Sequence, residues 1–274
     1  MIEFIDSHCH LQDDAFDHDR DEVVRRARSA GVTSLIVCGY DEAANLAALA
    51  LARRHTGLYP TVGFHPHEAA TVTPAMLVEL EQQAAISAVV AVGEIGLDFY
   101  RDHSPPDIQA SVLEEQLEIA LRIGKPVSIH TRGAEEAIEP HLRRYALRQG
   151  AAFSDRPVGV MHCFGGTLEQ AIRYVDLGFL ISLPCTVTYP KNEAGKQMAS
   201  LLPLESLAIE TDSPYLPPQA HRGKRNEPAY IVAAAEHIAA VRGISPARVA
   251  EITSRNASRL FALPVGAGDL VGAI

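Results

Sequence analysis

The sequence lacks the features that mark a secreted or membrane-bound protein. It has only four cysteines among 274 residues and no Cys-x-x-Cys pair. Its start, 1–4, has no basic region followed by a long apolar stretch, as a secretory signal would have. Uncharged runs such as 84–93 are much shorter than the ~20 residues that span a bilayer. We therefore expect a cytoplasmic protein without a membrane segment.

Positive charge is also scarce. The formal net charge is −10, which opposes non-specific binding to a polyanion, because such binding depends on Lys and Arg side chains. One compact cationic stretch, 221–225, contains Arg222, Lys224 and Arg225. Taken alone, such a stretch is more typical of a solvated loop. Any contact with nucleic acid should therefore be local.

Val, Ile and Leu are concentrated in eight short runs, which we interpret as strands buried on both faces. Segments with helical spacing separate them, and this alternation favours a parallel sheet. The length favours an α/β fold of the TIM-type (β/α)8 barrel, with an open doubly wound sheet as the second choice, because no glycine-rich dinucleotide motif follows the first strand. The predicted strands are 2–6, 33–38, 58–63, 88–93, 126–129, 157–161, 178–183 and 206–210.

We expect a single domain over 1–274, in which 1–263 form the barrel with extra C-terminal helices and 264–274 form a tail. The extra helices should pack against the outside of the barrel. Each is preceded by a residue suited to an N-cap. The predicted helices are 228–242 after Asn226 and 246–261 after Ser245.

Histidines and carboxylates stand at the ends of five of these apolar runs. Two of them, His8 and His10, are two residues apart, so both imidazoles should project to the same side of the strand end. The C-terminal ends of barrel strands meet at one mouth, where ligands remote in sequence can share a metal. A single histidine or aspartate in such a place is more often an ordinary polar group, but the set as a whole predicts metal binding. The predicted ligands are His8, His10, Glu94, His130, His162 and Asp212.

Six ligands exceed what one open catalytic ion needs, so we expect two divalent ions bridged by Glu94. Four imidazoles and two carboxylates suit zinc or manganese, whereas magnesium alone would prefer more oxygen. Glu94 and Asp212 are the predicted catalytic residues, with Asp212 helping to deprotonate the attacking water.

Other polar residues lie near these ligands in the sequence. His65 and His67 repeat the two-residue spacing without a carboxylate nearby in sequence, so we expect them to face substrate rather than metal. Cys9 and Cys163 neighbour predicted ligands, and we expect both to be buried without a role.

Asp6, Asp98 and Arg132 are close enough in sequence to orient the ligands or, for the arginine, to form a fork around phosphate. The alternative is that they are ordinary polar residues at strand ends. At the level of the sequence, neither interpretation is favoured.

Together, seven motifs closely resemble the TatD family and cover nearly the whole chain. The resemblance implies a metal-dependent barrel of the amidohydrolase type that acts as a DNase, commonly as a 3′-5′ exonuclease. The motifs are IDSHCHL at 5–11, GFHPH at 63–67, GEIGLD at 93–98, IHTR at 129–132, HCF at 162–164, ETDSPY at 210–215 and RGKRNEP at 222–228.

The resemblance also implies roles for individual residues. One ion would bind His8, His10, Glu94 and Asp212, and the second would bind Glu94, His130 and His162. His65 would lie beside the scissile phosphate. The full set of predicted substrate-binding residues is His65, His67, Arg132, Arg222, Lys224 and Arg225.

We therefore expect a monomeric enzyme that hydrolyses phosphodiester bonds in DNA, at single strands or 3′ ends, with water activated at a dinuclear metal centre. One alternative is hydrolysis of a small ester, lactone or amide. Glu94 at the end of the fourth predicted strand, where many amidohydrolase-type barrels carry a carboxylated lysine, favours phosphate. The other alternative is a non-catalytic scaffold that binds metal or DNA ends, against which the open ligand set argues.

Overall fold

The computed structural model describes residues 2–101, 103–150, 152–153 and 156–263. In this part of the chain eight parallel strands pair in the order of the sequence, from β1 to β8. The first and last strands then meet, because the N–H of Asp212 donates to the carbonyl of His8 at 2.9 Å and the N–H of His10 donates to the carbonyl of Ser213 at 2.7 Å. The predicted TIM-type barrel is confirmed. The predicted tail, 264–274, lies outside the described residues.

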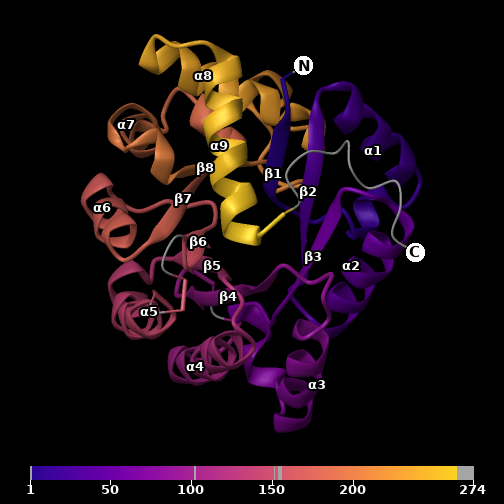
Figure 1. Cartoon of the computed structure of the whole chain (residues 1–274), viewed down its shortest axis with the longest axis vertical. Coiled ribbons are helices and arrows are strands. Elements are labelled where there is room, and N and C mark those ends of the chain that lie inside the picture. Colours follow the sequence, from indigo (N-terminus) through magenta and orange to yellow (C-terminus); the bar gives the residue numbers. More distant parts are fainter. Residues whose placement is uncertain (1, 102, 151, 154–155, 264–274) are drawn as a thin grey trace.

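Within the described residues, eight α-helices alternate with the strands and a ninth follows them (Figure 1). The strands are β1 Phe4–Cys9, β2 Val32–Cys38, β3 Leu58–Val62, β4 Ala91–Asp98, β5 Val127–Arg132, β6 Gly159–Met161, β7 Phe179–Pro184 and β8 Leu207–Glu210. The helices are α1 Arg20–Ser29, α2 Glu42–Arg54, α3 Pro74–Ala84, α4 Pro106–Ile123, α5 Glu135–Gly150, α6 Leu168–Asp176, α7 Glu193–Leu201, α8 Ile231–Arg242 and α9 Pro246–Phe261.

The helix boundaries follow from local chemistry. The side chain of Asp41 accepts the N–H of Ala44 at the start of α2, and Thr73 caps α3 ahead of a proline at the first helical position. Gly124, with φ of 65°, ends α4 in the left-handed conformation that glycine adopts most readily. Among the described residues, no helix has the length and apolar character to cross a bilayer.

The last helix, α9, closes one end of the barrel. Ala257, Leu260 and Phe261 are buried in one cluster with Ile5, Ala91, Val160, Leu180 and Ala208, which lie at or near the starts of their strands. Figure 1 shows α9, in yellow, crossing in front of the strands, whereas α1 to α8 surround them. The expectation that both extra helices pack outside the barrel was therefore wrong for α9. The N-terminal ends of the strands are plugged, so the opposite end is left to form a site.

Three strands extend further toward that opposite end than their apolar runs predict. β1 continues to Cys9, β4 to Asp98 and β5 to Arg132, because the interior of the barrel is lined by polar side chains near its mouth. Gly96 allows β4 and β5 to approach there, since a Cβ atom at this position would lie 1.8 Å from the carbonyl oxygen of His130.

The predicted N-caps of the last two helices have different outcomes. Ser245 caps α9 by accepting the N–H of Arg248, as expected. Asn226 was wrong as a cap, because a 3-10 turn, Pro228–Tyr230, precedes α8 and no side chain caps this helix. Instead, the buried amide of Asn226 donates to the carbonyls of Thr211, Tyr215 and Leu216. It thereby holds the loop that follows β8.

Candidate metal centre

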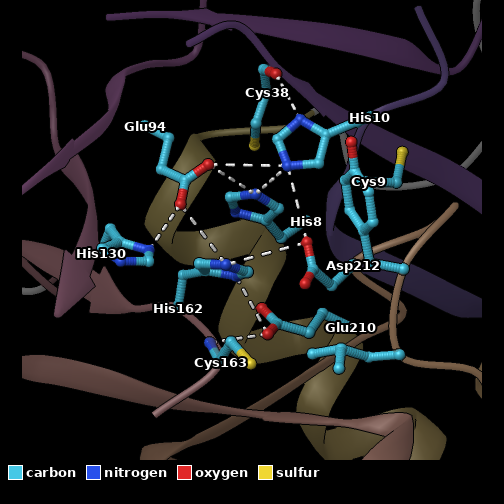
Figure 2. Close-up of polar contacts among 12 residues, drawn as sticks. His8, Cys9, His10, Cys38, Glu94, His130, His162, Cys163, Glu210 and Asp212 are labelled. Carbon is cyan, nitrogen blue, oxygen red and sulfur yellow. Dashed lines mark hydrogen bonds and ion pairs between the residues drawn. The ribbon is translucent and has the colours of Figure 1, made fainter. Parts of the chain in front are cut away.

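The six predicted ligands converge at the open end of the barrel (Figure 2). The strands themselves carry three of them, since His8 lies in β1, Glu94 in β4 and His130 in β5. The other three lie just beyond strand ends: His10 directly follows β1, His162 directly follows β6, and Asp212 lies two residues after β8. All six side chains are buried except that of His130, which is half-buried.

The first group of ligand atoms encloses a space the size of an ion. Nε2 of His8 and Nε2 of His10 are 3.2 Å apart, and they lie 3.5 and 3.6 Å from Oε2 of Glu94. Oδ1 of Asp212 is 3.5 Å from Nε2 of His10. Around tetrahedral zinc with bonds of about 2.0–2.1 Å, neighbouring ligand atoms are about 3.3–3.4 Å apart. The donor set and its spacing therefore fit a divalent cation.

The second group uses the other oxygen of Glu94. Oε1 lies 3.0 Å from Nδ1 of His130 and 3.6 Å from Nε2 of both His65 and His162. Figure 2 shows the carboxylate of Glu94 between His130 on one side and His10 on the other. Glu94 thus presents one oxygen to each group, which is the geometry expected of a bridging carboxylate.

Two histidines lie differently from what the sequence suggests. His65 was expected to face substrate, but its ring nitrogen lies within 4.8 Å of ligand atoms of Glu94 and His130, so it could also bind metal. His162 stands between the two groups, because Nε2 also lies 3.9 Å from Oδ1 of Asp212. His67 is further out, and its Nε2–H donates to Oδ2 of Asp98 at 3.0 Å.

Carboxylates and carbonyls behind the ligands fix the orientation of the imidazoles. Nδ1 of His162 lies 3.0 Å from Oε1 of Glu210, Nε2 of His130 lies 3.1 Å from Oδ2 of Asp98, and Nδ1 of His10 lies 2.9 Å from the carbonyl oxygen of Cys38. Such partners determine which nitrogen of each ring faces the metal and raise its basicity. Glu210 was missed at the level of the sequence, although its spacing from Asp212 repeats that of His8 and His10.

Asp6 acts on the backbone rather than on a ligand ring. Its carboxylate accepts the N–H and the hydroxyl of Thr211 at 2.9 and 2.6 Å, and the N–H of His8 at 3.3 Å. Complete burial raises the pKa of Asp6 to about 8, against the opposing effect of these hydrogen bonds. Asp6 therefore joins β1 to the segment that carries Asp212.

The electrostatics of the centre favour a bound cation. Burial lowers the pKa of His162, but the charges of Glu210, Glu94 and Asp212 outweigh it and raise the pKa to about 10. The pKa of Glu94 is held well below its usual range despite burial, because His65, His162 and His8 surround it. The negative charge that retains a proton on His162 would equally retain a metal ion, which competes for the same nitrogen.

The two cysteines beside the ligands differ. Cys9 is fully buried, and its thiol faces the carbonyl of Ile36, away from the imidazoles (Figure 2). Cys163 is only partly buried and lies within reach of His162 and Asp212 as a third ligand atom, so the expectation of full burial was wrong for it. Burial raises the pKa of its thiol well above the usual value, which disfavours the thiolate that metal binding requires.

A cavity of about 460 Å³ opens beside the centre. Its lining includes the candidate ligands His130, His162 and Asp212. Arg132 lines it as well, so a positively charged side chain shares the cavity with the candidate ligands. This volume lies within the range of about 300–1,000 Å³ found for small-molecule sites. Thr186 and Asn192, from the segment after β7, line it too.

The predicted cationic stretch after β8 divides into two parts. Arg225 donates to both carboxylate oxygens of Asp19, at 2.8 and 2.7 Å, and its guanidinium lies over the ring of Phe16. This engagement weighs against the predicted role of Arg225 in substrate binding. Arg222 and Lys224 are exposed, and within the described part of the chain neither forms an ion pair.

Comparisons with known proteins agree with this geometry. The family model described as TatD related DNase matches residues 5–262. The chain belongs to this family. A relative named 3′-5′ ssDNA/RNA exonuclease TatD, from Rahnella sp., is 36% identical over 92% of this chain and 96% of its own length. The uncharacterized metal-dependent hydrolase YabD of Bacillus subtilis is also 36% identical, over 93% of this chain and 98% of its own.

A solved structure extends the comparison to three dimensions. The crystal structure of YjjV, a TatD homologue from Escherichia coli K12, matches with a TM-score of 0.88 and 34% identity, covering 96% of this chain and 99% of that one. The chain is therefore an enzyme, a metal-dependent hydrolase with the TatD fold. Its clustered His, Glu and Asp side chains are able to bind metal.

Proposed function

We propose that this enzyme hydrolyses phosphodiester bonds in DNA, removing nucleotides from the 3′ end of single strands at a centre of two divalent ions. The observation that carries the proposal is that the two carboxylate oxygens of Glu94 face different groups of histidines. Oε2 faces His8 and His10, whereas Oε1 faces His65, His130 and His162. Two ions bridged in this way suit displacement at phosphorus, where both the attacking and the leaving oxygen need stabilisation.

The donor atoms suggest how the ions would be held. His8, His10, Glu94 and Asp212 would bind one, and Glu94 and His130 with His162 or His65 would bind the other. Zinc or manganese suits this nitrogen-rich set better than magnesium. When bound, the ions supply positive charge to the phosphoryl oxygens and lower the pKa of water.

The protein's own side chains would do the rest. Asp212 keeps its carboxylate ionised, because His10 and His162 outweigh the effect of burial and lower its pKa, so it can accept a proton from the attacking water. Arg132, on the cavity wall, can contact two phosphate oxygens with its planar guanidinium. Arg222 and Lys224 would add positive charge further along the bound nucleic-acid strand.

Nucleic acid is the favoured substrate on two grounds. The relative from Rahnella is named an exonuclease of single-stranded DNA and RNA. Among the described residues, Arg132 on the cavity wall forms no ion pair, and neither do Arg222 and Lys224, in a chain whose net charge is −10. A chain of this charge can bind a polyanion only where cations gather locally. That the enzyme acts as a monomer, and in the cytoplasm, stays a prediction.

The test is degradation of single strands labelled at the 3′ or the 5′ end, with metal removed by a chelator and then restored. We expect stepwise loss of the 3′ label, abolished by the chelator and recovered with manganese or zinc. Nitrophenyl phosphodiesters and nitrophenyl carboxylic esters should be assayed in parallel. Selective cleavage of the carboxylic esters would overturn the proposal in favour of an ester or amide substrate.

A further inference from the structure

An arginine and a tyrosine are stacked at the rim of the cavity. The guanidinium carbon of Arg132 lies 4.0 Å from the ring centroid of Tyr100, and Arg132 lines the cavity together with His130 and Asp212. Tyr100 is 65% exposed, so much of its ring is open to solvent although one side carries the guanidinium. This residue pair had no counterpart among the features predicted from the sequence.

The pair is anchored to the candidate metal centre through Asp98. Oδ1 of Asp98 accepts the N–H of Tyr100 and the N–H of Arg101, both at 2.9 Å, while Oδ2 is 3.1 Å from Nε2 of His130. The N–H of Phe99 donates to the carbonyl of Arg132 at 2.9 Å. The turn that presents the ring is therefore tied to the same carboxylate that orients a candidate ligand. A surface held in this way loses little conformational entropy when a ligand binds.

Single exposed aromatic residues are common on protein surfaces and by themselves indicate nothing. Here the ring is combined with a cation, and within the described residues Arg132 forms no ion pair. A second pair joins Tyr189, after β7, to Arg222, after β8, with 5.1 Å between the guanidinium carbon and the ring centroid. The hydroxyl of Tyr189 is fixed by donation to the carbonyl of Pro217 at 2.7 Å.

We propose that the Tyr100–Arg132 pair is a stacking site for one base of a single-stranded nucleic acid whose phosphate lies in the adjacent cavity. The inference rests on the proposed function. That function specifies only the phosphodiester of the substrate, and the inference adds where the enzyme would hold a base. Aromatic rings and guanidinium planes stack on every base, so such a site binds strands without selecting a sequence. Bases within a duplex are already paired and stacked, so the site admits single strands and frayed ends.

The experiment compares strands that differ by one base. Short phosphorothioate-linked single strands, which resist cleavage, would carry an abasic site at each of the last few positions from the 3′ end in turn. For the holoenzyme, we expect one position at which loss of the base weakens binding by about 5- to 100-fold. A 2-aminopurine at that position should be quenched on binding, because its ring stacks.

Substitutions then assign this preference to the proposed pair. Tyr100→Ala should bind the base-bearing and abasic strands with equal affinity and leave 2-aminopurine unquenched, whereas Tyr100→Phe should keep both effects. Leu147→Ala, at a 74% exposed position on α5, is the control and should behave as the unsubstituted enzyme. If Tyr100→Ala keeps the preference for the base, or if no position shows one, the inference is overturned.

The proposed function is tested separately, with an ordinary single strand in place of the resistant one. Failure of the unsubstituted enzyme to hydrolyse that strand would overturn the proposed function, whatever the abasic series shows. Hydrolysis without any dependence on Tyr100 would overturn only the stacking site.

Discussion

Nδ1 of His162 lies 3.0 Å from Oε1 of Glu210, and the same oxygen accepts the N–H of Cys163 at 2.7 Å. Glu210 is completely buried at the end of β8, so its charge acts on His162 without screening by water. This carboxylate fixes both the ring orientation of a candidate ligand and the turn that follows it.

Replacing Glu210 by Gln should therefore weaken metal binding. We expect a loss of about 10- to 100-fold in affinity, the range seen when the partner of a ligating histidine is removed. Titration with zinc or manganese, followed calorimetrically, measures it. Glu205→Gln is the matched control, because Glu205 is exposed just before the same strand. Equal metal affinity in the two variants would contradict the assignment.

Glu94→Gln should have a larger effect, because one carboxylate faces both groups of imidazoles. We expect hydrolysis of single-stranded DNA to fall by more than about 100-fold and the number of tightly bound ions to fall below that of the unsubstituted enzyme. Circular dichroism should show an intact fold. Full activity of this variant on single strands would exclude the bridging role.

Metal affinity should depend on pH with a defined sign. The pKa of His162 is raised to about 10, so below that pH the imidazole carries a proton that a cation must displace. Affinity should therefore rise with pH, by about tenfold per unit for this one proton, and level off as pH passes about 10. Calorimetry in two buffers of different ionisation enthalpy would count the protons released. No release at neutral pH would contradict the prediction.

Substitution of Arg225 should affect stability, whereas substitution of Arg222 should affect DNA binding. Arg225→Gln loses both hydrogen bonds to Asp19 and should lower the free energy of unfolding by roughly 1–3 kcal/mol. Arg222→Gln should leave stability unchanged but weaken binding to single-stranded DNA and reduce its salt dependence. Denaturant unfolding and salt-dependent binding measure the two effects.

The contribution of Arg225 to the free energy of unfolding should also be lost in acid. Hydrogen bonds from Arg225, and secondarily from Arg26, lower the pKa of Asp19 from 3.8 to about 2. The stabilisation is therefore present above the unfolded value of 3.8 and is lost as pH falls through about 2. A difference in stability between Arg225→Gln and the unsubstituted protein that persists undiminished through this range would assign it to packing on Phe16.

Much of the barrel could be predicted because β-branched and aliphatic runs are the only signal that buried parallel strands require. The runs at β1, β4 and β5 end too early, since the strands continue through the polar residues of the mouth, where His8, Glu94 and His130 stand. The side chains at these strand ends are polar because they form the candidate site, not because they are exposed to solvent. At these three strands, the residues by which the strand outlasts its apolar run therefore include candidate ligands.

Partners remote in sequence could not be predicted. Nothing near Arg225 in the chain indicates Asp19, and nothing near His67 indicates Asp98, because each pair forms only when loops from different strands pack together. The proximity of His65 to Glu94 likewise depends on the loop after β3. Glu210 is the exception, because its spacing from Asp212 was a readable signal.

The junction of β1 with β8 brings residues from the two ends of the described fold into one candidate metal site. His8 and Asp212 lie on neighbouring segments, joined by a backbone hydrogen bond of 2.9 Å between the amide of Asp212 and the carbonyl of His8. During synthesis, the group of candidate ligands that includes His8 and Asp212 therefore stays incomplete until the eighth strand has docked. Fragments left by proteolysis between those residues and separated from one another would be catalytically silent.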